Sequence, residues 1–441
     1  MTIKLLLVFI AIMVNSTSSY AQQMQKITYS EQPRKVDSLK IHEGILSQHA
    51  MKIRYMRKGK SVAKITLSEP VMVAMANQEE QWGYFQFPTV GRAEDGTLIV
   101  TWQMRADSHT AYGKLAEKRY KPMMSKDGGI TWVPMDKEYF SLHGNYYVKL
   151  KDGGILQIYT PMTKDIHSFE IFPQPVARKG GKDFYIADSL PDKLQGTFFN
   201  YWDKEKKTKS FHARIIDPGY LRYAIDGLMP VVWWENIKEL SNNSLLAGIY
   251  PTYYRSDCGE VLPNGVTFYS SDDNGYTWKV KGKINSEKID GVGFDEPSYE
   301  ILSDSSLICV LRTGSVSPMY SSFSKDFGKT WSKPRPFTPN GVRPWLKMME
   351  NGVLILASGR PGVQLRFSFD GTGKNWSDSI DMLPFMNSDG TYNREVSCGY
   401  AAILELNKNS FLIVYSDFMT KNIHGLLRKS IWCRKVTVKT N

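Results

Sequence analysis

The chain has few cysteines and few histidines, with 4 Cys and 7 His in 441 residues. Four cysteines are too few for a disulfide scaffold in a chain of this length. No His-x-x-x-His or Cys-x-x-Cys spacing occurs, so the sequence gives no support for a zinc site. Neither a Walker loop nor a Gly-x-Gly-x-x-Gly loop occurs, so it gives none for a nucleotide. We therefore expect neither a metal nor a cofactor.

Long apolar runs are also scarce. One run of ten residues, 5–14, follows Lys4 and precedes a small-x-small sequence at 19–21. This order is typical of a secretory signal peptide, and ten residues are too few to span a bilayer. We expect residues 1–21 to be removed near Ala21, and the mature protein to be periplasmic or secreted without membrane insertion.

The positive charge is not gathered into blocks. Lys and Arg number 56 against 44 Asp and Glu, which gives a formal net charge of +12. Because an exported protein without a long basic block rarely meets nucleic acid, we expect no nucleic-acid partner. The 42% of hydrophobic and 23% of charged residues exclude wholesale disorder, and 34 Gly, 24 Tyr and 11 Trp favour turns and aromatic-rich strands.

A short motif, Ser-x-Asp-x-Gly-x-Thr-Trp, recurs along the chain. Copies start at Ser125, Ser271 and Ser324, and a fourth at Ser368 carries one extra residue. The Asp can accept hydrogen bonds from backbone N–H groups of a tight turn, the Gly can take a positive φ, and the Trp can pack beneath the turn. We expect four structural turns and no chemistry at these aspartates.

A second repeat is a hairpin in which two apolar runs flank a polar turn. The six turns lie at 95–96, 152–153, 242–243, 304–305, 351–352 and 408–409. Since a four-stranded blade takes about 40–50 residues, the hairpins predict an all-β, six-bladed propeller over residues 76–441. Residues 154–230 are long for one blade and predict an insertion into the second. Residues 22–75 are expected to form an N-terminal extension or to close a blade.

The ends of the hairpins predict where chemistry is located. Residues equally far before and after a turn lie at the same end of a hairpin, as Glu296 and Arg312 do around Asp304. If the hairpins are innermost, one mouth of the central channel collects Gln86, Arg105, Asp107, His109, His143, Glu296, Arg312, Arg343, Arg360 and Tyr400. Several guanidinium groups suit a carboxylate, and a Tyr beside a Glu has the base that a phenolate nucleophile needs.

The four-copy motif is that of the Asp-box repeat, and the chain resembles the sialidase (neuraminidase) superfamily over roughly residues 76–436. The resemblance implies a six-bladed propeller and a retaining exo-glycosidase with a Tyr nucleophile. Asp boxes also occur in propellers without sialidase activity, so function has to be argued from the site.

Individual segments carry the resemblance further. LIVTWQMRADSHTAYG resembles the sialidase segment with a substrate-binding Arg before the acid/base Asp, which implies these roles for Arg105 and Asp107. DEPSYEILSDSSLICVLR resembles the segment of the nucleophile's partner Glu and the second triad Arg, hence Glu296 and Arg312. CGYAAILELNKNSFLIVY resembles the segment that opens with the nucleophile, and ASGRPGVQLRFSFDG that of the third triad Arg, which implies these roles for Tyr400 and Arg360.

One position departs from the family. Sialidases open the first blade with Arg-Ile-Pro after an aromatic residue, whereas this chain has Gln86 between Phe85 and Phe87. A neutral amide lacks the charge and the bidentate fork of Arg, a loss of roughly 1.5–3 kcal/mol in a dry site. The resemblance implies a glycan that ends in sialic acid, and Gln86 makes a related terminal acidic sugar an alternative.

Other interpretations stay open. Arg312 and Arg360 can form surface ion pairs, Tyr400 can be a core aromatic, and Asp107 can be a turn residue. His109 and His143 can be structural, or they can serve a hydrolase or lyase that acts on uronic-acid polysaccharides. A third alternative is a propeller that binds glycans without catalysis. We expect a monomer in each case.

Overall fold

The computed structural model describes residues 27–28, 44–57, 60–111, 117–137, 141–143, 147–159, 164–205, 207–230, 233–286, 293–314 and 317–440. The predicted signal peptide, residues 1–21, lies outside the described residues. No helix in the described part of the chain is long and apolar enough to cross a membrane.

All six hairpins predicted from the turn residues form as antiparallel strand pairs. They are β6 (Gln86–Ala93) with β7 (Leu98–Gln103), β11 (Tyr147–Lys149) with β12 (Ile155–Tyr159), β20 (Trp233–Glu239) with β21 (Leu245–Thr252), β24 (Asp295–Ile301) with β25 (Leu307–Arg312), β28 (Val342–Met348) with β29 (Leu354–Gly359), and β32 (Ala401–Asn407) with β33 (Ser410–Lys421). The period-2 pattern of apolar residues on both sides of each turn accounts for this outcome.

Further strands extend each hairpin into a sheet. They are β8 (Met123–Ser125), β9 (Val133–Pro134), β10 (Ser141–His143), β16 (Thr197–Trp202), β17 (Thr208–Ile216), β22 (Gly265–Ser271), β23 (Thr277–Ile284), β26 (Met319–Ser324), β27 (Arg335–Thr338), β30 (Val363–Ser368), β31 (Ile380–Asp381) and β34 (Leu427–Thr440). A parallel pairing of β17 with β23 joins two of these antiparallel meanders into one eight-stranded sheet.

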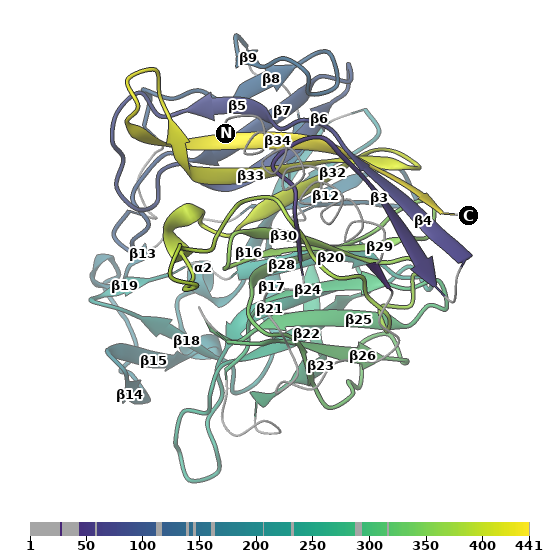
Figure 1. Ribbon diagram of the computed structural model, residues 1–441. Coiled ribbons are helices and arrows are strands. Elements are labelled where there is room, and N and C mark those ends of the chain that lie inside the picture. The colour runs from purple at the N-terminus through teal and green to yellow at the C-terminus, as the bar shows by residue number, and fades with distance from the viewer. Residues whose placement is uncertain are drawn as a thin grey trace, which may run out of the picture.

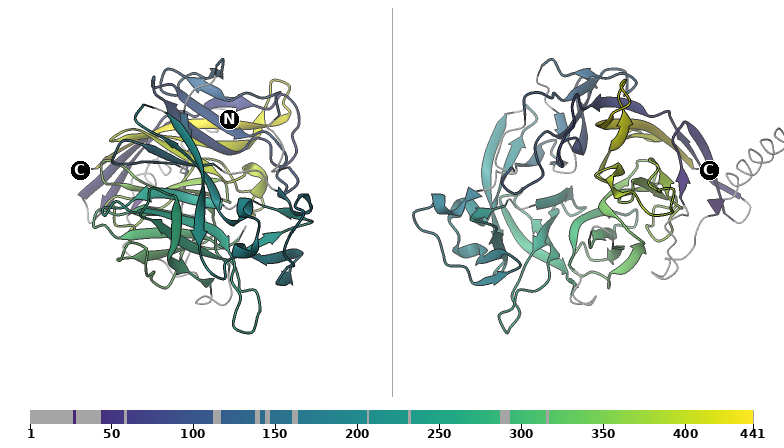
Figure 2. Two further views of the ribbon diagram at one scale, coloured as in Figure 1. Left: turned by 180° about the vertical axis from the view of Figure 1, so that it is seen from behind. Right: turned by 60° about the vertical axis from the view of Figure 1, so that its left-hand side comes forward.

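The sheets follow one another around a common centre in chain order, as the colours show in the right-hand view of Figure 2. The first strands of successive hairpins contact each other there. Strand β11 contacts β20, β20 contacts β24, β24 contacts β28, β28 contacts β32, and β32 contacts β6. The last sheet, yellow in Figure 1, lies beside the first, because β32 and β33 contact β6. The result is an almost purely β-structure with a propeller-like arrangement.

The N-terminal segment packs on the last sheet. Strand β34 pairs with both β4 (Lys60–Leu67) and β5 (Val71–Met75), and β4 pairs in turn with β3 (Met51–Arg57). Strand β1 (Ile27–Thr28) pairs with β3, and β2 (Ile45–Leu46) pairs with β31. Arg434 in β34 is 1% exposed, and its guanidinium donates to the backbone oxygens of Ser47, His49 and Ser68. Because a buried guanidinium needs these acceptors, Arg434 ties the segment to the sheet.

The four recurrent motifs form turns that share a Ser-to-Asp and a Trp-to-Gly hydrogen bond. In the second copy Asp273 accepts from the hydroxyl of Ser271 at 2.7 Å and from the backbone N–H of Thr277 at 2.8 Å. Trp278 is fully buried, and its indole N–H donates to the oxygen of Gly275 at 2.9 Å. The Trp–Gly bond recurs in the other three copies at 2.8 to 3.2 Å. These contacts are the ones expected from a structural turn.

The long stretch before β16 and after β17 holds additional elements, drawn at the lower left of Figure 1. They are β13 (Lys164–Asp165), β14 (Ala177–Lys179), β15 (Lys182–Ile186), β18 (Leu221–Ala224), β19 (Leu228–Met229), the short helix α2 (Asp192–Gln195), and the 3-10 turns η2 (Ile166–Ser168) and η3 (Ala187–Ser189). They enclose two small apolar clusters, one of which also includes Tyr253 and Val261. We call these elements the insert, and they fall within the predicted region 154–230.

Side chains of β24 bind the edge of the neighbouring strand β28. Glu296 Oε2 accepts from the N–H of Arg343 at 3.0 Å, and Ser298 Oγ accepts from Leu346 at 2.9 Å. Glu300 Oε2 accepts from the N–H of Met348 at 3.0 Å. Since unpaired N–H groups at a buried strand edge are costly, these alternate side chains satisfy the edge of β28 and hold the two strands together. Glu296 is thereby fixed from one side.

Candidate active site

The first strands of three hairpins begin with the same irregularity. In β24 the register against β25 shifts between Asp295 and Ser298, and Glu296 within the shift has a φ of +39°. β6 and β28 carry matching shifts, with Phe87 at +51° and Arg343 at +45°. Each of these residues precedes a proline. A non-glycine residue at positive φ costs about 1–3 kcal/mol, and such strain collects at functional sites.

All three bulge residues meet at Tyr400, which directly precedes β32. The Tyr400 hydroxyl donates a hydrogen bond to Glu296 Oε1. The Phe87 ring lies edge-on to the Tyr400 ring, with centroids 4.6 Å apart, and the guanidinium carbon of Arg343 lies 5.9 Å from the centre of the same ring. Three strands far apart in sequence therefore position one phenol.

The carboxylate of Glu296 is held at both oxygens. Oε1 forms an ion pair with Arg312 Nη1 at 2.8 Å, and Oε2 accepts from the backbone N–H of Arg343. Arg312 Nη1 also lies 3.3 Å from the Tyr400 hydroxyl, and its Nε donates to Gly314 O. Since Glu296 is 8% exposed, this pairing compensates a charge that burial alone would make costly.

The electrostatics of this group favour a protonated phenol. Burial raises the pKa of Tyr400 well above its ordinary value, and the charge of Glu296 raises it further against the opposing effect of Arg312. Burial alone would lower the pKa of Arg312, but Glu296 raises it above its ordinary value. Tyr400 becomes a nucleophile only if its proton leaves, and Glu296 is in position to accept that proton.

Asp295 lies at the same place and was not singled out from the sequence. It pairs with Arg312 across the strands and accepts a hydrogen bond from Asn264 Nδ2 at 2.7 Å. Burial, with the nearby charge of Glu296, raises the pKa of Asp295 to about 6, against Arg312 and Lys182 of the insert. The adjacent residues Asp295 and Glu296 were the signal in the sequence for a perturbed carboxyl group, because two neighbouring carboxylates repel each other and rarely both ionise beside one cation.

A second group contains Asp107 and Arg360. Trp82 Nε1 donates to Asp107 Oδ2 at 3.2 Å, and the guanidinium carbon of Arg360 lies 5.7 Å from the centre of the Trp82 ring. Arg360 Nε also donates to the backbone oxygen of Cys398 at 3.2 Å, two residues before Tyr400. The Arg360 side chain therefore connects the Asp107 group to the segment that carries the phenol.

The remaining predicted residues are placed differently. Gln86 is fully buried, and neither its amide oxygen nor its nitrogen has a hydrogen-bond partner among the described residues. His109 Nε2 pairs with Asp226 of the insert at 3.3 Å. Arg105 is partly buried beside Asp107 in sequence, and His143 lies in β10, opposite Gly91 of β6, with a side chain outside the described part.

The structure describes no metal centre. No group of three His, Cys, Asp or Glu residues in the described ranges has the geometry to hold an ion. The four cysteines, 258, 309, 398 and 433, are all free thiols, and only Cys258 is exposed. Trp234 at the start of β20 is 2% exposed and belongs to an apolar cluster.

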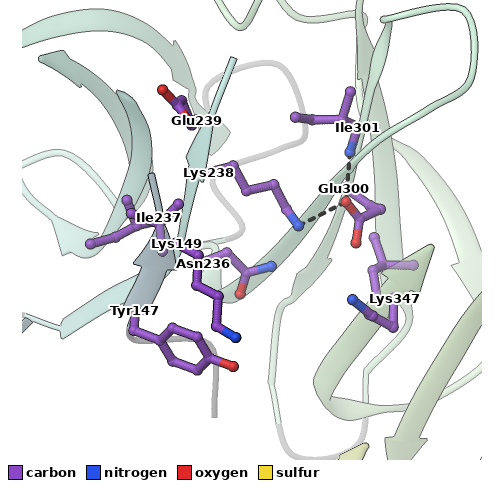
Figure 3. Close-up of a pocket in the computed structure, with 11 residues that line it drawn as sticks. Tyr147, Lys149, Asn236, Ile237, Lys238, Glu239, Glu300, Ile301 and Lys347 are labelled. Atoms are coloured by element: carbon purple, nitrogen blue, oxygen red, sulfur yellow. Dashed lines mark hydrogen bonds and ion pairs between the residues drawn. The ribbon is translucent and has the colours of Figure 1, made fainter. Parts of the chain in front are cut away.

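A separate hollow of about 400 Å³ lies farther along the inner strands (Figure 3). Lys238 Nζ reaches Glu300 across it at 2.7 Å, and Lys149 and Lys347 lie on neighbouring strands. Glu300 is four residues beyond Glu296 on β24 and is already bound to the edge of β28. None of the site residues predicted from the sequence lines this hollow.

The chain is similar in structure to several solved proteins. A protein of unknown function from Dyadobacter fermentans matches with a TM-score of 0.55 and 18% identity, over 85% of this chain and 99% of that one. An α-L-arabinanase from Penicillium chrysogenum, complexed with arabinobiose, matches with a TM-score of 0.47 and 13% identity, over 83% of this chain and 98% of that one. A NanB sialidase from Streptococcus pneumoniae matches with a TM-score of 0.42 and 16% identity, over 87% of this chain and 76% of that one.

These likenesses concern the fold. All three proteins are less than 25% identical to this chain, and of the three only the Dyadobacter fermentans protein exceeds a TM-score of 0.5. No protein-family model matches the chain, and no curated protein sequence matches it. Function therefore has to follow from the site itself.

Proposed function

We propose that the protein is an exported, six-bladed, sialidase-like propeller that hydrolyses a terminal acidic sugar from glycans, with retention of configuration. The six antiparallel meanders would be the blades of a domain over residues 76–441, preceded by an extension at 22–75 and a signal peptide at 1–21. The observation that carries the function is the buried group in which Tyr400 donates to Glu296 beside Arg312.

In the first step Tyr400 Oη attacks the anomeric carbon and the glycosidic carbon–oxygen bond breaks. The phenolic proton passes to Glu296 Oε1, to which the hydroxyl is already hydrogen-bonded. Asp107 gives its proton to the leaving oxygen, so the aglycone departs as an alcohol. The product of this step is a glycosyl group bound to Tyr400.

In the second step water hydrolyses that bond. Asp107, now ionised, takes a proton from the water as its oxygen attacks the anomeric carbon, and Tyr400 recovers its proton from Glu296. The Arg312 ion pair keeps Glu296 oriented throughout. Two displacements at one carbon return the original anomeric configuration, so the released sugar is expected to be the retained anomer.

Positive charge around Tyr400 supports an acidic sugar. Arg312, Arg343 and Arg360 all approach the segment that carries Tyr400, and guanidinium groups bind carboxylates through paired hydrogen bonds. Arg105 and His109 lie on the Asp107 segment and are candidates for further polar contacts with the glycan. Gln86, at the position of the first triad Arg of sialidases, is fully buried. This supports a substrate carboxylate that is bound by fewer guanidinium groups than the three of the sialidase triad.

The test is incubation with sialylated and uronic-acid glycans, followed by mass spectrometry of released sugars. We expect a free acidic monosaccharide from the wild type and none from Tyr400→Phe or Asp107→Ala. An unsaturated product that absorbs in the ultraviolet would instead indicate a lyase. Binding without any released sugar would indicate a non-catalytic glycan-binding protein, and either outcome overturns the proposal.

A further inference from the structure

Trp82 and Asp107 are joined twice. The indole N–H of Trp82 donates to Asp107 Oδ2 at 3.2 Å, and the backbone N–H of Asp107 donates to the Trp82 oxygen at 3.3 Å. One bond fixes the backbones against each other, and the other fixes the carboxyl group. A side chain linked in both ways has little freedom to turn away from its place.

Gly83 makes this close approach possible. It has a φ of +109°, and a Cβ atom there would lie 2.2 Å from the backbone nitrogen of Asp107 and 2.6 Å from Ala106 C. No L-residue fits such a gap without displacing backbone, so the Trp82–Gly83 segment can lie against the Asp107 segment only with glycine present. The contact between Trp82 and Asp107 is therefore built into the chain and is not a chance surface pairing.

The Trp82 ring is held from other segments while 39% of the residue remains exposed. Phe418 of β33 meets the ring edge-on, with centroids 6.1 Å apart. Lys429 of β34 places Nζ 5.7 Å from the ring centre and donates to the backbone oxygen of Gln81 at 2.7 Å. With the guanidinium carbon of Arg360 at 5.7 Å as well, the indole has a defined orientation at a partly exposed position.

The direction of the indole bond has a chemical consequence. An indole N–H only donates, so Asp107 Oδ2 has to be an acceptor in this contact. When the carboxyl group is protonated, its proton is thereby directed to the other oxygen, Oδ1. A general acid needs its proton on the oxygen that faces the leaving group, and Trp82 supplies that selection.

We propose that Trp82 is a positioning residue that holds the Asp107 carboxyl group in the orientation and protonation pattern needed to protonate the leaving oxygen. This inference rests on the proposed function, in which Asp107 is the acid. Trp82 acts only through Asp107 and takes no part in the attack by Tyr400. Its effect should therefore appear only where departure of the leaving group needs a proton.

The test compares two substrates that carry the same acidic sugar. The disaccharide sialyl-galactose has a poor leaving group that needs protonation, and para-nitrophenyl sialoside has a good one that needs little. If the glycan panel returns a uronic acid, the corresponding disaccharide and para-nitrophenyl uronide replace them. The variant is Trp82→Phe, which keeps an aromatic ring against Phe418 and removes the N–H. Phe418→Leu is the control, because it alters the packing of the ring and keeps the N–H.

Trp82→Phe is expected to lower kcat about 10-fold on the disaccharide, because one hydrogen bond to the Asp107 carboxyl group is lost, with KM within about twofold. On the nitrophenyl substrate, kcat of Trp82→Phe should stay within about twofold of the wild type. Phe418→Leu should keep kcat within about twofold of the wild type on both substrates. Equal losses on both substrates, or no loss on the disaccharide, would overturn the inference. Failure of the proposed function is distinct, since Tyr400→Phe and Asp107→Ala would then retain activity on the disaccharide.

Discussion

The Tyr400 hydroxyl donates a hydrogen bond to Glu296 Oε1, although the two residues are 104 positions apart in the chain. The contact joins the residue that precedes β32 to a strained bulge at the start of β24, with Arg312 closing the group. A buried phenol gains a partner in this way, and the carboxylate gains a cation. The same arrangement provides a nucleophile, its base and a compensating charge, so it makes several predictions.

Tyr400→Phe removes the nucleophilic oxygen and leaves the ring that packs on Phe87. Turnover of the acidic-sugar substrate should fall by at least about 10³-fold while the melting temperature changes little. Tyr415→Phe is the matched control, because it removes the same atom from a buried tyrosine of β33 outside the proposed machinery. Comparable activity in the two variants would remove Tyr400 from the mechanism.

Glu296→Gln replaces the base by an amide of the same shape. The amide oxygen can still accept from the N–H of Arg343, but the proton acceptor and the ion pair with Arg312 are lost. Turnover should fall about 10²–10⁴-fold, and the free energy of unfolding by about 3 kcal/mol, since Arg312 loses the carboxylate that it contacts directly. Steady-state kinetics and urea unfolding measure the two effects, and a variant with normal kcat would contradict the assignment of the base.

Asp295→Asn tests the raised pKa of Asp295, which burial and Glu296 place at about 6. The folded state then binds the proton more tightly than the unfolded state, so this group destabilises the protein as pH rises from about 4 to about 6. The expected cost above that window is about 3 kcal/mol. Asn keeps the contact with Asn264, so the variant should be more stable than the wild type at pH 7.5 and not at pH 4. Parallel stability–pH curves would show that the shift is absent.

Asp326→Ala tests the structural role of the recurrent turns. Asp326 accepts from Ser324 Oγ at 2.8 Å, and from the N–H and hydroxyl of Thr330 at 2.8 and 2.6 Å. Burial alone would raise the pKa of Asp326, but these hydrogen bonds lower it, so its stabilisation is present at neutral pH and lost in acid. We expect a loss of about 1–2 kcal/mol at pH 7 with kcat/KM unchanged. An active-site role would appear as lost activity in a folded variant.

Gln86→Leu tests the position that departs from the sialidase pattern. The Gln86 amide is fully buried and has no hydrogen-bond partner in the described part of the chain, so it carries a desolvation penalty. An apolar side chain of similar volume should raise the free energy of unfolding by roughly 1 kcal/mol and leave KM within about twofold. A tenfold rise in KM would mean that the amide contacts the substrate.

The sequence predicts the sheets better than it predicts the site. Turn residues such as Asp304 and Asn351 fix hairpin positions because their chemistry is local, and every hairpin they predict is present. The position of Glu296 opposite Arg312 follows from the same counting. By contrast, the bulge that aims Glu296 at Tyr400 depends on contacts with β28 and β32, which no local pattern encodes.

Two further features were beyond the sequence for the same reason. Trp82 reads as an ordinary aromatic residue before Gly83, and its contact with Asp107 arises only when the two segments are folded together. In the sequence Arg434 is one of many basic residues in a terminal strand, yet in the structure it binds the backbone oxygens of Ser47, His49 and Ser68. Long-range partners decide both roles, and a single sequence does not show them.

The central claim is that Tyr400 forms a covalent bond with the sugar, and trapping that bond tests it most directly. A fluorinated acidic sugar with fluoride as leaving group slows the second step, so the glycosyl-enzyme should accumulate. Intact-protein and peptide mass spectrometry should then find one added sugar, on the peptide that contains Tyr400. An active protein that carries the label on Glu296 or Asp107, or that stays unlabelled while it releases the inverted anomer, would contradict the account.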